Sequence, residues 1–149
     1  MMKPCLLALA AVAATSATMA PTGVQVSGWA RPTVNGQSSA AAYLVIRNYG
    51  PGADRLVSVS SPAANMAGVH RSQISGGVAR MRSAGSIVVP AGKMLAMAPG
   101  GLHVMLMGLR NPLRTGATLP LTVLFEHGGE RQIRLPIQMN APYDQPHGH

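Results

Sequence analysis

Cysteine is almost absent from this chain of 149 residues, whose one copy is Cys5. A single thiol near the start leaves no partner for a disulfide and no thiolate ligand in the rest of the chain. Blue-copper electron-transfer centres depend on a cysteine ligand, so the sequence after Cys5 excludes that class. Any metal site farther along the chain must use other side chains.

Aromatic and acidic residues are also scarce. Aromatic side chains make up 3% of the chain, so Val, Leu, Ile, Ala and Met must fill the interior. Twelve Lys and Arg residues stand against four Asp and Glu, which gives a net charge of +8. Such a charge first suggests nucleic acid, but the arginines are scattered and no row of aromatics could stack bases. We expect no nucleic-acid partner, because a basic surface here fits an acidic protein or an anionic membrane face better.

The first twenty residues have the pattern of a secretory signal peptide. A basic start containing Lys3 precedes an apolar run at residues 6–14, and the segment ends at the small residue Ala20. The run is shorter than the roughly 20 residues that a membrane-spanning helix needs. We therefore predict a signal peptide at 1–20, a periplasmic location and no stable membrane span after cleavage. The mature chain then comprises a domain at 21–139 and a flexible, histidine-containing tail at 140–149.

Short strands separated by turns account for most of the mature chain. Residues 24–29 alternate apolar and polar side chains, and residues 43–46 form a continuous apolar run. Gly, Pro and Asn break the pattern at regular intervals, and no stretch keeps a helical period for long, although 61–66 could form one helical turn. The other expected strands are 56–60, 69–74, 78–82, 86–89, 94–97, 103–109, 121–126 and 131–138. This spacing predicts an all-β fold, either an antiparallel β-sandwich or a Greek-key barrel.

Two His/Met pairs stand out on this scaffold. In the strand 103–109, alternation places His103, Met105 and Met107 on one face, with neighbours about 6.6 to 7 Å apart. His70 and Met81 belong to the two arms of a predicted hairpin. If the turn is 75–76, the two side chains lie directly opposite each other; if it is 76–77, Met81 is a diagonal neighbour on the same face.

Imidazole and thioether ligands without a thiolate suit Cu(I) better than zinc. Local spacing alone does not require a metal, because alternation and hairpins are common and lone methionines usually fill cores. We expect a surface position for His127. We expect a packing role in the core for four methionines, namely Met94, Met97, Met107 and Met139. No carboxylate pair and no Ser/His/Asp arrangement has a convincing context, so we expect no enzyme.

The gaps between the four candidate ligands are more specific. His70, ten residues, Met81, twenty-one residues and then His103-Val104-Met105 resemble the H-x10-M-x21-H-x-M signature of the periplasmic copper chaperone family PCu(A)C. The likeness extends over roughly 26–136 and is densest from 99 to 109. It implies a cupredoxin-like antiparallel β-sandwich of Greek-key type that binds one Cu(I) through His70, Met81, His103 and Met105.

The resemblance also implies partners. In this family the ion passes to an apo copper-site protein, notably subunit II of cytochrome oxidase, and a thiol-disulfide copper assembly protein is a further implied partner. Copper storage for tolerance, and a metal-free β-sandwich that serves as a scaffold or adhesion module, remain as alternatives.

Four positions qualify the resemblance. Arg71 occupies a position where the family often has methionine or glutamate, and its fixed charge cannot bind copper. Met66 could supply a further thioether, although we expect it to pack. His147 and His149 resemble the metal-binding tails of some members, so the tail is either a weaker Cu(II) site or a flexible end without a metal.

Overall fold

The computed structural model describes residues 23–142, all of which belong to strands, turns and loops. The predicted signal peptide at 1–20 and the tail histidines His147 and His149 lie outside these residues. The strands are β1 (Val24–Ala30), β2 (Ser39–Asn48), β3 (Asp54–Ser60), β4 (Ala64–Ser75), β5 (Val78–Ser83), β6 (Ile87–Val89), β7 (Met94–Ala96), β8 (Leu102–Leu109), β9 (Thr118–Phe125) and β10 (Gly129–Pro136). Within the described part of the chain, no helix is long and apolar enough to cross a membrane.

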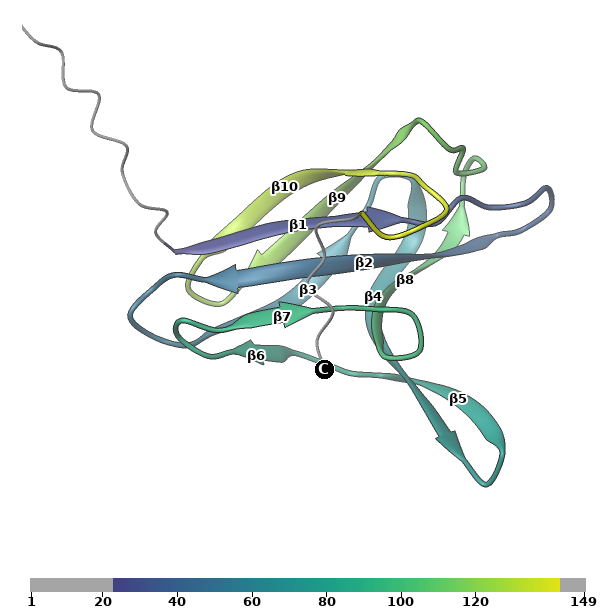
Figure 1. Ribbon diagram of the computed structural model, residues 1–149. Coiled ribbons are helices and arrows are strands. Elements are labelled where there is room, and N and C mark those ends of the chain that lie inside the picture. Colours follow the sequence, from purple (N-terminus) through teal and green to yellow (C-terminus); the bar gives the residue numbers. More distant parts are fainter. Residues whose placement is uncertain (1–22, 143–149) are drawn as a thin grey trace, which may run out of the picture.

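The strands form two sheets that pack face to face (Figure 1). The first sheet has the order β1-β2-β8-β4-β5, with β7 also pairing with β2, and the second has the order β10-β9-β3-β6. All the pairings between these strands are antiparallel. Several neighbours, such as β2 with β8 and β3 with β9, are far apart in sequence, which is the connectivity of Greek-key sandwiches. The predicted all-β antiparallel sandwich is confirmed.

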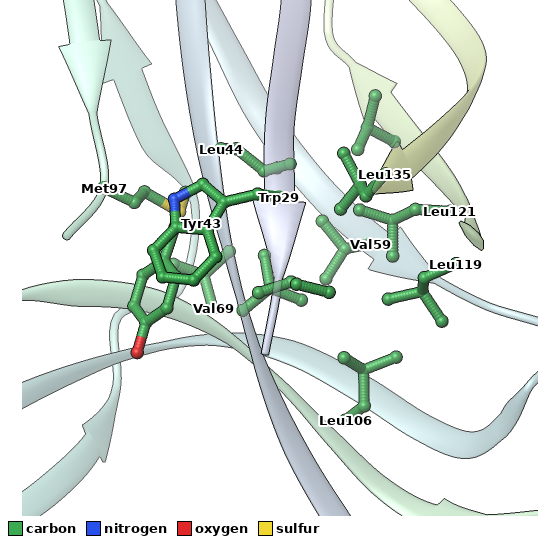
Figure 2. Packing of buried hydrophobic residues seen from close by; sticks show 14 of the residues in the cluster. Trp29, Tyr43, Leu44, Val59, Val69, Met97, Leu106, Leu119, Leu121 and Leu135 are labelled. Atoms are coloured by element: carbon green, nitrogen blue, oxygen red, sulfur yellow. The ribbon is translucent and has the colours of Figure 1, made fainter. Parts of the chain in front are cut away.

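The core between the sheets is built mainly from aliphatic side chains, as the scarcity of aromatic residues requires (Figure 2). Phe125 on β9 is its largest fully buried member. Trp29 and Tyr43 are directly paired across β1 and β2, and their ring centroids lie 4.8 Å apart. Beside this pair the backbones of β1 and β2 lie so close together that a Cβ atom at Gly28 would collide with the carbonyl oxygen of Tyr43.

The helical turn expected at 61–66 is wrong. Residues 62–63 form a turn, after which β4 begins at Ala64, paired with Leu109 of β8. The hydroxyl of Ser61 accepts a hydrogen bond from the backbone N–H of Ala63 (3.1 Å) and donates one to the carbonyl of Pro120 (2.6 Å). Sheet pairing and this serine contact therefore outweigh the weak local preference for a helix.

The packing role expected for the methionines is confirmed only for Met97, which is 1% exposed. Met94 and Met139 are 39% and 61% exposed, and Met107 is half-buried. Met66, also expected to pack, is 64% exposed. A strand pattern alone does not reveal which of its side chains remain exposed.

A buried carboxylate ties β3 to the turn between β9 and β10. Asp54 accepts hydrogen bonds from the backbone N–H groups of Arg55 (2.7 Å), His127 (2.9 Å) and Gly128 (2.8 Å). Burial by itself would raise the pKa of Asp54, but these backbone hydrogen bonds lower it below its usual value. The side chain of His127 is exposed, which confirms its predicted surface position.

Candidate metal centre

Strand β8 divides its side chains cleanly between two faces. Leu102, Val104 and Leu106 belong to the core cluster. The intervening His103 and Met105 therefore project from the outer face of the first sheet, meaning the face turned away from the second sheet. The predicted placement of this His/Met pair on one face is confirmed.

Strand β4 brings the second histidine directly beside the first. His70 is the cross-strand partner of His103, and Gly68 is the partner of Met105. The two imidazole rings are roughly parallel, with centroids 6.2 Å apart and an interplanar angle of 24°. Two imidazoles from strands that are far apart in sequence thus face each other on the outer face.

The β4–β5 hairpin places Met81 on the same face. Its turn is 76–77, and the register pairs Ser72 with Met81 and His70 with Ser83. Met81 is therefore a diagonal neighbour of His70, and the alternative with the two side chains directly opposite is wrong. Gly76 and Gly77 have φ values of 57° and 78°, which the favoured two-residue hairpin turn requires at both central positions.

Each of the two histidines has one buried ring nitrogen without a hydrogen-bond partner among the described residues. His103 is only 4% exposed, and its Nδ1 lies 3.2 Å from the carbonyl oxygen of Gly101, so the ring donates its proton there. That tautomer leaves a lone pair on Nε2, which is buried and unpaired, as is Nδ1 of His70. Buried polar atoms without partners are rare and costly, and two in adjacent rings are what a metal ion would satisfy.

The candidate site is buried at its histidines and open at its methionines. Gly68, opposite Met105, presents no side chain, and a Cβ atom added there would lie 3.5 Å from Cε1 of His70. Met105 is half-buried, whereas Met81 is 59% exposed on a hairpin that extends away from the rest of the sandwich (Figure 1). The candidate donors therefore differ in exposure, from the buried imidazole of His103 to the exposed thioether of Met81.

Carboxylates do not complete this site. Between residues 23 and 142, no group of three or more His, Cys, Asp or Glu side chains could hold a metal ion. An ion bound by His70 and His103 would therefore need the thioethers, and a donor set without negative charge favours Cu(I). Arg71 is exposed, and the alternation along β4 places it on the face opposite to His70.

Sequence reasoning did not single out Gly68 or Gly101. Gly68 precedes His70 by two residues, so alternation along the strand could have placed it on the ligand face. No sequence pattern indicates the role of Gly101. Its carbonyl oxygen contacts the His103 ring because of the conformation of the loop before β8.

Comparisons with known proteins agree with this architecture. The family described as "Putative lipoprotein LpqE-like" matches residues 24–137. A curated relative, "Putative lipoprotein Lxx21020" of Leifsonia xyli subsp. xyli (strain CTCB07), is 36% identical over 118 residues, which cover 78% of this chain and 70% of the relative.

Solved structures of copper-related domains are similar as well. The apo PCuAC domain from PmoF1 has a TM-score of 0.67 and 27% identity, covering 81% of this chain and 98% of that domain. The solution structure of CuI-DR1885 from Deinococcus radiodurans has a TM-score of 0.61 and 26% identity, covering 85% of this chain and 84% of that protein. The predicted resemblance to PCu(A)C domains and the predicted cupredoxin-like β-sandwich are confirmed.

Proposed function

Because this chain belongs to the LpqE-like family and shares the fold of PCuAC domains, we propose that it is an exported metallochaperone that binds Cu(I) and passes it to another protein. One observation carries the proposal. Among residues 23–142, the buried nitrogens His103 Nε2 and His70 Nδ1 have no hydrogen-bond partner, and they lie on a sheet face that also bears two thioethers. The proposed ligands are His70, Met81, His103 and Met105.

The proposed mechanism follows from the exposure of these ligands. Neutral imidazoles and thioethers hold Cu(I) less tightly than thiolates would, which suits an ion that must leave again. Met81 is the most exposed of the four, so an incoming ligand of the recipient would replace it first. His103 is the most buried and would release the ion last. Each exchange replaces one neutral ligand by another donor, and copper stays in the +1 state.

The proposed recipient is the copper centre of subunit II of cytochrome oxidase, with a thiol-disulfide copper assembly protein as a further partner. Export rests on the predicted signal peptide at 1–20, which would place the mature chain in the periplasm. Loss of Lys3 with the signal peptide lowers the net charge from +8 to +7, and this positive charge supports docking to an acidic protein surface. His147 and His149 form a second, weaker proposal, a Cu(II) site that does not depend on the first.

The binding half of the proposal is tested by titrating the mature chain with Cu(I) against a competing chelator under anaerobic conditions. Wild-type protein should retain one Cu(I) per chain, and the His103→Ala, Met105→Ala double variant should lose it. Met139→Leu is the control for loss of a thioether outside the site, because Met139 is exposed and lies outside β4, β5 and β8. Unchanged affinity in the double variant would overturn the assignment of these ligands, whereas no Cu(I) binding by wild type would favour a metal-free scaffold.

The delivery half needs a recipient. Copper-loaded protein is mixed with the apo copper domain of oxidase subunit II, the two are separated, and copper is measured in each. Transfer to that domain, faster than from a Cu(I)-chelator complex of equal affinity, supports a chaperone. Retention of the ion would instead favour copper storage.

A further inference from the structure

Two further methionines form a cross-strand pair on the same outer face as the histidines. Met66 of β4 lies directly opposite Met107 of β8. The β4–β8 register is unbroken from this pair to the His70/His103 pair, so side chains two residues apart stay on one face. The outer face therefore carries, in order, a pair of thioethers, then Met105 opposite Gly68, and then a pair of imidazoles.

This methionine pair is accessible and is not needed for packing. Met66 is 64% exposed, and Met107 is half-buried. Neither residue belongs to the core cluster, and Val69 and Val104, which do belong to it, point to the opposite face. Side chains directly opposite each other have Cβ atoms about 4.5 to 5.5 Å apart, so two flexible methionines can turn both sulfurs to one ion.

The methionine pair is too far from the histidines to share their ion. The two pairs are four positions apart along each strand, which corresponds to about 13 Å at roughly 3.3 Å per residue. Met105 lies midway, at about 6.6 to 7 Å from its neighbours on β8. Gly68 gives Met105 no side-chain partner directly across on β4, and Cε1 of His70 lies beside that position, 3.5 Å from where a Cβ of residue 68 would be.

We propose that Met66 and Met107 form a second Cu(I) site, held by thioethers and weaker than the site at the histidines. The ligand set selects the ion: two neutral, soft sulfurs favour Cu(I) and offer little to Zn²⁺, Mg²⁺ or Ca²⁺. Binding adds two Cu–S contacts without any change in oxidation state and without release of protons. This site does not require the proposed function, because its ligands are separate from those of the first.

The test is a titration followed at the methionine methyl groups. The mature chain is labelled with [methyl-13C]methionine and titrated with Ag(I), a soft ion of the same charge as Cu(I) that does not undergo redox chemistry. The methyl signals of Met66 and Met107 should shift together, at a higher ion concentration than those of Met81 and Met105. In the Met66→Leu, Met107→Leu variant the shifts of Met81 and Met105 should remain and the stoichiometry should fall by one ion.

Met94 and Met139 provide internal controls, since both are exposed and neither lies on β4 or β8. The proposal is overturned if the Met66 and Met107 signals stay fixed when the ion is in excess. It is equally overturned if they move only in step with Met94 and Met139, which would be nonspecific thioether binding. If Met66 and Met107 shift while Met81 and Met105 do not, this site stands and the proposed principal site fails.

Discussion

Replacing His103 with leucine should make the metal-free protein more stable while removing its copper response. His103 is buried, and its Nε2 has no partner among the described residues, which costs free energy as long as no ion is bound. Leucine has a similar size and no polar atom, so the variant removes this cost. The ring also donates a hydrogen bond to the carbonyl of Gly101, which the variant loses.

The expected gain follows from these two terms. An unsatisfied buried polar atom costs about 1 to 3 kcal/mol, and a neutral hydrogen bond contributes about 0.5 to 1.5 kcal/mol. The carbonyl of Gly101 is not left unpaired in the variant, because it also accepts a hydrogen bond from the N–H of Ser72 (3.1 Å). The net effect is a gain of about 1 kcal/mol in the free energy of unfolding, or roughly 3 to 6 °C in Tm for a domain of this size.

Thermal or urea unfolding with and without Cu(I) measures both effects. A ligand at 100 times its Kd stabilises a protein by about 2.7 kcal/mol, so wild type should overtake the variant once copper is added. The matched control is Met105→Leu, which keeps the apolar volume and removes only the sulfur, so its metal-free stability should change little. A metal-free His103→Leu protein less stable than wild type would refute the cost assigned to Nε2. An undiminished copper response would refute its role as a ligand.

Three further outcomes are expected. Met81→Leu should weaken Cu(I) binding about tenfold or more in a chelator competition, and it should leave metal-free stability unchanged because the side chain is 59% exposed. Asp54→Asn should cost about 1.5 to 3 kcal/mol in urea unfolding near neutral pH, since the amide NH2 would face the N–H of Gly128. Burial opposes the shift, but backbone hydrogen bonds hold the pKa of Asp54 below its usual value. The wild-type advantage is therefore complete above that usual value, shrinks as the pH falls through the lower folded value, and should nearly vanish below both. Gly28→Ala should destabilise the protein by about 2 kcal/mol or more, measured as a lower Tm, because its Cβ would collide with the carbonyl of Tyr43.

Local patterns predicted much of this architecture. Alternation along residues 103–109 placed His103 and Met105 on one face, because the side-chain period of a strand does not depend on tertiary context. The hairpin register required one more step. Two consecutive glycines satisfy the positive φ values of the tight turn, whereas Ser75 would have needed an unfavourable conformation, so the 76–77 register could have been preferred from the sequence.

Long-range pairing lay beyond such reasoning. The direct opposition of His70 and His103 depends on β4 pairing with β8, and no local pattern determines which of several strands become neighbours. Exposure of individual side chains is equally nonlocal. Met66 was expected to pack, but the alternation that buries Val69 on the core face leaves Met66 on the outer one.

The tight turn before β8 has a consequence for how the affinity of such a site can be adjusted. The N–H of Gly101 bonds to the carbonyl of Ala98 (3.0 Å), and Gly100 has a φ of 86°, so Pro99 and Gly100 occupy the corner of the turn. The carbonyl of Gly101 in turn holds both the His103 ring and the backbone of β4 at Ser72. Substitutions at Pro99 or Gly100 would therefore change the relative orientation of the two imidazoles without removing either of them. The metal affinity of such a site can change in this way while its ligands stay the same.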